Sequence, residues 1–351
     1  MPKQGIEVKA LKSKLVHEEA NWALCIGAGC SNGLFPLWTN LAKSLMKHIG
    51  AYPYEEGHAD DIIKNFGPDA LIQAVYNVSG LDENGFCDLL SEHIYAGLKG
   101  KLAPDEWKLI VRGLGAKCPD ELQNDWRDFI CILQRVAGGN NTSFDLAEII
   151  CESIKQDRRP SAILSFNAEP LLYSLLNGYT YTYLNSKLKN VDFVNQSIAN
   201  RNNNRIPYYF CHGTVPVLDS SNRVKKRFLV ADKIVFSENE YLQLSNSSYS
   251  WQSSTFINAI SSNVVFFVGF SMTDINIRRW LSWLHHCRIN EIHRKNAGVK
   301  DSTTHFWINK SPHNNQLKRW YEASVAHLGI RIIWIDEWDQ IKNVLKIGLG
   351  L

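Results

Sequence analysis

Glycines, amides, hydroxyls and one histidine follow the apolar stretches of this sequence at points where strands are predicted to end. In a parallel sheet the carboxyl ends of the strands meet at one edge, where ligands bind. A glycine turn lets a phosphate approach the backbone, an amide can orient a sugar hydroxyl or a water, and a histidine with its ordinary pKa near ~6.5 can take a proton. The residues so placed are Gly27, Ala28, Gly29, Cys30, Ser31, Asn167, His212, Gly213, Gly269, Phe270, Ser271 and Asn309.

The first of these turns has the form of a dinucleotide-binding unit. A strand predicted at 22–26 runs into Gly27-x-Gly29, and a helix is predicted from Thr39 to about His48. The N–H groups of such a turn can hold a pyrophosphate. However, the next glycine is Gly33, and no acidic residue ends a strand about 20 residues later, as the dehydrogenase motif requires. A tight turn in an ordinary α/β protein is therefore an equally open interpretation.

The remaining sequence alternates predicted strands and helices after a short leading helix at 6–18. Uninterrupted apolar strands of this kind are buried on both faces of a sheet. The predicted fold class is therefore α/β, with a Rossmann-like parallel sheet covered by helices on both faces and an inserted helical module. Further strands are predicted at 161–166, 207–211, 227–230, 264–268, 305–308 and 330–335.

The helical module is predicted over residues 51–154, where strand patterns give way to helical ones separated by turn clusters. Residues 1–50 and 155–351 then form the α/β domain, and an independent helical domain is the alternative. Residues 177–206 are polar and rich in asparagine, which predicts an exposed loop and a candidate lid between Asn167 and His212. The predicted helices of the module lie at 60–66, 69–78, 86–98, 105–114, 122–136 and 143–154.

The bulk composition excludes several classes of protein. With 351 residues, 45% apolar and 21% charged, the chain can bury a sizeable core, and its net charge of +3 is too small to indicate nucleic-acid binding. No apolar run approaches the ~20 residues of a membrane span. The first residues lack the apolar core of a secretory signal, so a cytoplasmic location is expected. The eight cysteines contain no C-x-x-C pair, which predicts free thiols and no bound metal.

Four segments, in chain order, resemble sirtuin-like (Sir2-like) domains. Gly27 to Ser31 with Pro36-Leu37-Trp38 resembles the opening G-A-G-x-S…P-x-W of that family. The other three are Ser165-Phe166-Asn167-Ala168-Glu169, which resembles T-x-N-x-D, Cys211-His212-Gly213, which resembles the catalytic H-G, and Gly269-Phe270-Ser271-Met272-Thr273-Asp274, which resembles the G-[YF]-S-x-x-D of bacterial sirtuin-like defence proteins.

The resemblance implies an NAD+ glycohydrolase that cleaves NAD+ to nicotinamide and ADP-ribose, and that acts in anti-phage defence by depleting NAD+. NAD is then the substrate, and no metal takes part. Asn167 and His212 are the implied catalytic residues, Asn167 orienting the ribose or a water and His212 acting as general base. The implied NAD-binding residues are Gly27, Ala28, Gly29, Cys30 and Ser31 at the pyrophosphate, Trp38 and Glu169 beside them, and Gly269, Ser271 and Asn309 towards the adenosine half.

The resemblance also implies control by self-assembly into a homo-oligomer, by a defence-system partner such as an ATPase or a nucleotide-sensing or nucleotide-processing protein, or by both. Two departures bear on the activity. The paired cysteines of the deacylase zinc module are missing, which argues against protein deacylation, and Glu169 replaces the aspartate of T-x-N-x-D. An NAD-dependent deacylase and a non-catalytic nucleotide-binding sensor remain the alternatives.

Each candidate residue also has a purely structural interpretation. Asn167 could cap the helix that follows it, and His212 could be a hydrogen-bonded core histidine. Asp274 is expected to cap a helix, and the basic run at 223–227 to be a solvated hairpin. His285-His286-Cys287 is expected to lie on a helix surface, since adjacent helical residues point in different directions.

Overall fold

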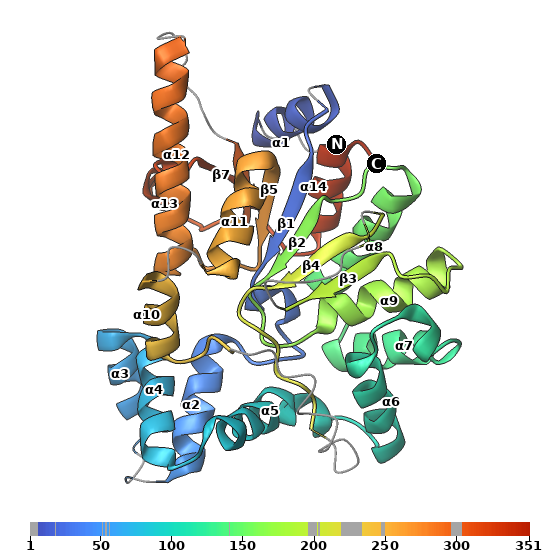
Figure 1. The fold of residues 1–351 in the computed structure, drawn as a ribbon, viewed down its shortest axis with the longest axis vertical. Coiled ribbons are helices and arrows are strands. Elements are labelled where there is room, and N and C mark those ends of the chain that lie inside the picture. Colours follow the sequence, from blue (N-terminus) through green and yellow to red (C-terminus); the bar gives the residue numbers. More distant parts are fainter. Residues whose placement is uncertain are drawn as a thin grey trace.

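One parallel sheet forms the centre of the molecule (Figure 1). The computed structural model describes residues 6–17, 19–50, 52, 55, 57–139, 141–195, 202, 204–218, 234–246, 250–295 and 304–351. Within them, seven strands lie in the order β3-β4-β2-β1-β5-β6-β7, all parallel, which confirms the predicted Rossmann-like α/β fold. The strands are β1 (Trp22–Ile26), β2 (Ala162–Ser165), β3 (Val191–Val194), β4 (Ile206–Phe210), β5 (Val264–Val268), β6 (His305–Lys310) and β7 (Ile330–Ile335).

The sheet is buried on both faces, as its uninterrupted apolar strands predict. Successive side chains of a strand point to opposite faces, so Leu24 and Ile26 of β1 enter one hydrophobic cluster while Ala23 and Cys25 enter another. The first cluster packs under α1 (Ile6–Lys12), α2 (Trp38–Ile49), α8 (Thr142–Lys155), α9 (Leu171–Tyr183) and α14 (Gln340–Leu349). The second packs under α10 (Glu238–Asn246), α11 (Trp251–Ser262), α12 (Ile275–Lys295) and α13 (Asn315–Ala326).

The predicted helices between residues 51 and 154 all form. They share one hydrophobic cluster with the sheet, because Trp126 and Phe129 are fully buried in the cluster that also holds Phe266 of β5. The last of them, α8, packs against both α9 and α14. The domain boundaries at 50 and 155 stay a prediction. The helices are α3 (His58–Phe66), α4 (Pro68–Ser79), α5 (Glu83–Lys99), α6 (Pro104–Gly115) and α7 (Asp125–Ala137), followed by α8.

The prediction of an exposed loop at 177–206 is wrong for most of the described residues in this range. Residues up to Tyr183 continue α9, and Asn177 and Thr180 are buried in it. Val191–Val194 is the edge strand β3, and the Asp192 carboxylate receives hydrogen bonds from Arg205 and from the Asn202 N–H. The polar side chains misled the prediction because they are hydrogen-bonded inside the fold. Residues 196–201 and 203, the strand predicted at 227–230 and the basic run at 223–227 lie outside the described residues.

Local signals in the sequence locate several helix starts correctly. Ser237-x-x-Glu240 has the pattern of a capping box, and Glu240 accepts the N–H groups of Phe236 and Ser237 at the start of α10, which is the glutamate half of such a box. Asp274 accepts the N–H groups of Asn276 and Ile277 and so caps α12, as expected. The leading helix is shorter than predicted, since α1 passes into a π-helical turn (Ser13–His17).

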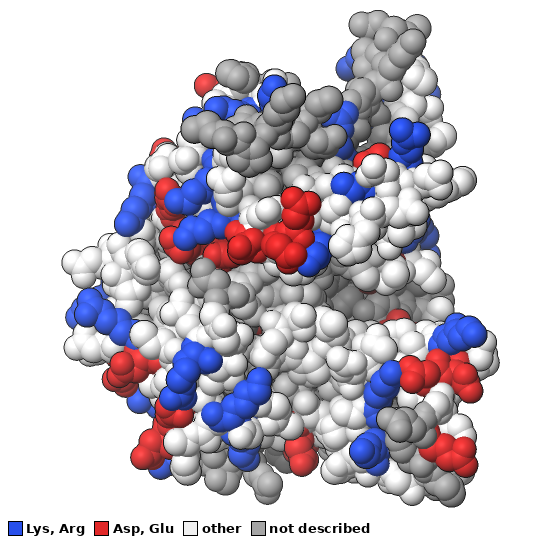
Figure 2. Space-filling model, turned by 180° about the vertical axis from the view of Figure 1, so that it is seen from behind, with Lys and Arg blue, Asp and Glu red and all other residues white. Residues whose placement is uncertain are grey.

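The surface carries a mixture of charges. On the face shown in Figure 2, basic and acidic side chains are interspersed and separated by wide uncharged areas, in keeping with the small net charge. In the part of the chain that the structure describes, no helix is both long and apolar enough to cross a membrane.

The ends of β1 and β5 pack backbone against backbone. The chain leaves β1 towards β2 and later returns to β5 on the other side of β1, so this is the point where the strand order reverses. The N–H groups of Gly27 and Gly29 donate to the carbonyls of Val268 and Gly269, both at 3.0 Å. A Cβ on Gly27 would lie 2.6 Å from the Gly269 carbonyl oxygen, and one on Gly29 would lie 2.9 Å from the Gly269 Cα.

We expect Gly27→Ala to lower the free energy of unfolding by ~1–3 kcal/mol, because the added methyl meets backbone that cannot move aside. Chemical denaturation followed by circular dichroism measures this. Gly97→Ala is the matched control, since an added Cβ there meets nothing within 4 Å in an exposed helical turn. It should be neutral or stabilising by about 0.5–1 kcal/mol. Equal stability of the two variants would contradict the tight contact.

Candidate functional site

The predicted site residues lie along the carboxyl edge of the sheet. Ile26 pairs with both Ser165 and Val268, and Ser165 pairs with Phe210, so four strands end at one level. The segments that follow are also tied together, since Cys211 N–H donates to Ser165 and Val215 N–H to Ala168. The edge thereby brings together the turn from Gly27 to Ser31, Asn167, Glu169, His212 and Gly269.

The glycine turn has fewer free N–H groups than its sequence suggests. The N–H groups of Gly27, Gly29 and Cys30 all donate to carbonyls of the protein. The Cys30 thiol is buried and donates to the Val268 carbonyl, and the pKa of this thiol is raised, mainly by burial. Pyrophosphate binding at this turn stays a prediction, and the N–H groups of Gly27, Gly29 and Cys30 are already bonded within the protein.

Asn167 has an unsatisfied acceptor in a buried position. Its side chain is 4% exposed, and its Nδ2 donates to Oε1 of Glu169 at 2.9 Å. This bond fixes the orientation of the amide, and it leaves Oδ1 buried without a hydrogen-bond partner. A buried acceptor in this state is costly unless a ligand or a water supplies the donor. The helix-cap interpretation of Asn167 is wrong, because Glu169 Oε2 accepts the Leu171 N–H at the start of α9.

Glu169 connects three parts of the edge. Besides Asn167 and the start of α9, its carboxyl interacts with the Ser31 hydroxyl of the glycine turn. Burial raises the pKa of Glu169 to about 7, and the hydrogen bonds from Leu171, Ser31 and Asn167 oppose this shift. Glu169 therefore acts in this structure as a support for Asn167 and for the turn.

His212 is a buried, uncharged base between aromatic rings. It is 6% exposed and contacts the rings of Phe166 and Tyr241 edge to face, with centroids 4.8 and 5.1 Å apart. Burial lowers the pKa of His212 to about 4, although the Asp274 carboxylate opposes this shift. The prediction that this histidine has an ordinary pKa is therefore wrong. Such packing also suits a core histidine, and the Asp274 carboxylate faces its Nε2 at 3.9 Å.

Trp38 contacts the helices of residues 51–154, which we call the helical segment. Its indole Nε1 donates to Oδ1 of Asp69 at 2.5 Å, and its ring packs on Phe236 with centroids 4.9 Å apart. Burial raises the pKa of Asp69 to about 6, and the negative charges of Asp274 and Glu238 add to that rise. Asp69 of α4 thus lies close enough to Asp274 for their charges to interact, which places the helical segment beside the His212 side of the edge.

Helix α5 holds the chain that follows His212. The hydroxyls of Tyr95 and Ser91 donate to the carbonyls of Val215 and Pro216, both at 2.7 Å. The helical segment therefore contacts the carboxyl edge through α4 and α5, and also through α8, where the Ser143 hydroxyl donates to the Cys30 carbonyl at 2.9 Å.

Two predicted residues stand apart from this group. The Ser271 hydroxyl is exposed and pairs with that of Thr273 at 2.6 Å, and Asn309 Oδ1 accepts the N–H of Lys310. Asn309 lies within β6 rather than after its end, and it is beside Gly269, because Phe267 pairs with Trp307 two residues earlier on each strand. Within the described residues, no contact joins the side chain of Ser271 or Asn309 to Asn167 or His212.

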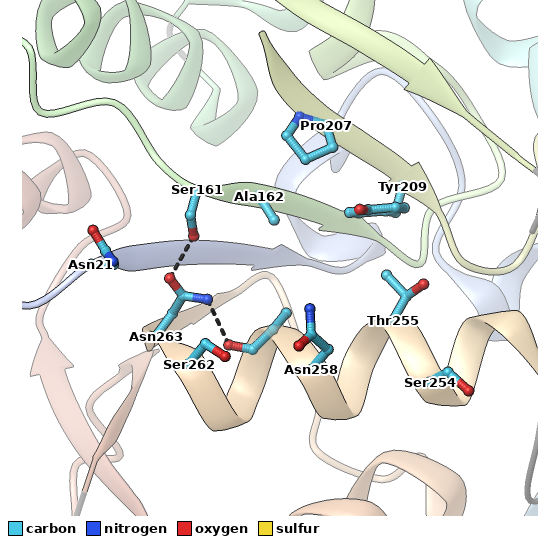
Figure 3. A pocket seen from close by; sticks show the side chains of 11 residues that line it. Asn21, Ser161, Ala162, Pro207, Tyr209, Ser254, Thr255, Asn258, Ser262 and Asn263 are labelled. Atoms are coloured by element: carbon cyan, nitrogen blue, oxygen red, sulfur yellow. Dashed lines mark hydrogen bonds between the residues drawn. The ribbon is translucent and has the colours of Figure 1, made fainter. Parts of the chain in front are cut away.

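The pocket drawn in Figure 3 lies at the opposite end of the strands. It has a volume of about 440 Å³ and lies between α11 and the amino ends of β1, β2 and β4. Asn263 bridges it, accepting from Ser161 and donating to the Ala259 carbonyl. None of the predicted site residues lines this pocket, so it is separate from the carboxyl edge.

Across the ranges that the structure describes, no cluster of three or more histidine, cysteine or acidic side chains could hold a metal ion. No disulfide joins the described cysteines. The expectation that no metal takes part stays a prediction.

Residues 161–333 match the SIR2-like domain family, so the chain carries a SIR2-like domain, and this part of the resemblance is confirmed. The match covers β2 to β7 and includes Asn167, Glu169, His212 and Asp274. It indicates a sirtuin-related, NAD-binding function. None of the curated proteins matches the chain.

Sequence reasoning missed three residues around His212. Phe166 and Tyr241 pack on its ring, and Asp274 was interpreted only as a helix cap. The aspartate of G-[YF]-S-x-x-D was the signal available for Asp274. Tyr241 and Asp69 had none, because each reaches the edge from a helix that no motif marks.

The raised pKa of Glu169 predicts a pH dependence of stability. Its folded pKa of about 7 lies above the ordinary value of 4.5, so its contribution is fully present below about pH 4.5 and is lost as the pH rises through 7. We expect the free energy of unfolding of the parent to fall by up to about 3 kcal/mol more than that of Glu169→Gln between pH 5 and pH 8. Denaturant titrations at both pH values measure this.

The exposed Glu92→Gln on α5 is the matched control and should follow the parent at both pH values. Parallel pH curves for the parent and Glu169→Gln would show that Glu169 ionises normally in the folded protein.

Proposed function

We propose that this protein is an NAD+ glycohydrolase that cleaves NAD+ to nicotinamide and ADP-ribose. The observation that carries the proposal is the buried Asn167 Oδ1, which has no partner and lies on the strand end next to that of His212. A ribose hydroxyl or the attacking water would supply the missing donor. The SIR2-like match and the site's neutral histidine support the same chemistry.

The chemistry requires little of the protein beyond positioning. Breaking the bond from nicotinamide to ribose develops positive charge on the sugar, and nicotinamide leaves without strong acid assistance. Asn167 would orient the ribose or the water, and the neutral His212 would accept a proton from a hydroxyl. Asp69 and Asp274 lie on the His212 side, where carboxylates would stabilise the developing cation. The nicotinamide half would therefore lie near His212, with the pyrophosphate near Ala28 and Ser31.

We further propose that the activity serves anti-phage defence by NAD+ depletion in the cytoplasm, and that a homo-oligomer or a partner protein, such as an ATPase or a nucleotide-sensing or nucleotide-processing protein, controls it. An unrestrained NADase would be toxic to its own cell, so the isolated protein should be nearly silent. Because α9 and β3 occupy residues 177–183 and 191–194 of the segment expected to be a lid, we assign the control to the helical segment. This assignment is supported by the hydrogen bonds that Asp69, Tyr95 and Ser91 of this segment make with Trp38, Val215 and Pro216.

We expect Asn167→Ala and His212→Ala to fold normally and to lower the rate of NAD+ consumption by ~10²–10⁴-fold, since each loses a group that acts in the transition state. Asn167→Ala should still bind NAD+. The measurement is chromatography of nicotinamide and ADP-ribose, with purified protein over a range of concentrations and with bacterial cells before and after phage infection. Asn258→Ala in the separate α11 pocket is the control and should match the parent.

Two results would contradict the proposal, and each would favour a different function. Binding of NAD+ without consumption in any of these settings would favour a nucleotide-binding sensor. Loss of NAD+ only in the presence of an acylated peptide, with deacylation of that peptide, would favour a protein deacylase.

A further inference from the structure

The two carboxylate oxygens of Asp274 have different surroundings. Oδ1 accepts the N–H groups of Asn276 at 2.8 Å and Ile277 at 3.1 Å, and these bonds begin α12. Oδ2 faces Nε2 of His212 at 3.9 Å, and Asp274 is largely buried there. Rotation of the carboxylate would break the two capping bonds, so the helix end holds Oδ2 towards the histidine.

The other nitrogen of His212 meets a hydroxyl. Nδ1 lies 3.2 Å from the Tyr241 hydroxyl of α10, within hydrogen-bonding distance. The rings of Phe166 and Tyr241 both contact the imidazole nearly at right angles, at 87° and 83°. The imidazole is therefore held by the aromatic rings and by the Tyr241 hydroxyl at Nδ1, while its Nε2 faces a carboxylate.

Two states of the neutral ring are available, with the proton on Nε2 or on Nδ1. A carboxylate accepts hydrogen bonds and cannot donate them, so it favours a proton on the nitrogen that it faces. A hydroxyl can donate to the bare nitrogen at the other end. Both neighbours of His212 are thus satisfied when the proton is on Nε2.

We propose that Asp274 is the positioning residue of His212: it keeps the proton on Nε2 and leaves Nδ1 as the nitrogen that accepts a proton in the reaction. The inference rests on the proposed NAD+ hydrolysis. In the step concerned, an O–H bond of the water or of a ribose hydroxyl breaks and an N–H bond forms at Nδ1. The reacting hydroxyl takes the place of the Tyr241 hydroxyl, and the positive charge gained by the ring faces the Asp274 carboxylate.

The substitution Asp274→Asn tests the proposal because the helix cap fixes the orientation of the new amide. Asparagine caps a helix as well as aspartate does, with Oδ1 again accepting the N–H groups of Asn276 and Ile277. Its NH₂ group must then face Nε2, and a donor there favours a bare Nε2 and a proton on Nδ1. The variant should therefore reverse the tautomer of His212, at nearly unchanged stability.

Nitrogen NMR of the labelled imidazole, on ligand-free protein at neutral pH, reads the tautomer directly. We expect a proton on Nε2 in the parent and on Nδ1 in Asp274→Asn. In the NAD+ assay, kcat should fall by about 10²–10⁴-fold with little change in KM, because the basic nitrogen now carries the proton. Asp82→Asn, at the cap of α5, is the matched control and should change neither readout.

A parent with the proton on Nδ1, or an Asp274→Asn variant with the parent's tautomer and kcat, would overturn the proposal. The NMR readout needs no turnover, so it separates the two proposals. A reversed tautomer in a protein that never consumes NAD+ would support the role of Asp274 and reject the proposed hydrolysis. An unchanged tautomer in an active enzyme would reject the role of Asp274 and support the proposed hydrolysis.

Discussion

The contact between the turn after β1 and the turn after β5 is the constraint on which the rest of the site depends. At this point two backbones approach so closely that side chains at Gly27, Gly29 and Gly269 would overlap with the opposite turn. The same contact aligns the ends of the two strands and uses the N–H groups of Gly27 and Gly29 as hydrogen-bond donors. The glycines of the sequence motif therefore serve the fold directly.

Burial gives the polar residues of the carboxyl edge their properties. Removal from water makes His212 uncharged and makes Glu169 harder to ionise. Burial also gives the unpaired Asn167 Oδ1 a cost in folding free energy, because this oxygen has lost its hydrogen bonds to water and has no partner in the protein. Such groups are tolerated where a bound molecule or a water supplies the missing hydrogen bond.

The sequence predicts those features that depend on local pattern. Uninterrupted apolar strands gave the parallel sheet, turn clusters gave the helices of the helical segment, and the position of Asn167 and His212 just past strand ends located them at one edge. The features that sequence reasoning missed depend on packing between distant segments. Asn177 and Thr180 look like loop residues but are buried in α9, where the Asn177 amide donates to the Ala116 carbonyl. Tyr241 and Asp69 reach the edge from helices, where neither spacing nor a turn signal marks them.

The contacts of α5 with Val215 and Pro216 have a consequence for how the protein can be taken apart. The helical segment and the sheet share one hydrophobic cluster, and the helix hydroxyls satisfy carbonyls that follow directly on the His212 turn. Excision of residues 51–154 would strip apolar side chains from one face of the sheet and leave those carbonyls unpaired. The sheet thus depends on the helical segment for part of its apolar cover. A molecule that binds beside Asp69, Ser91 or Tyr95 would therefore lie next to the candidate site.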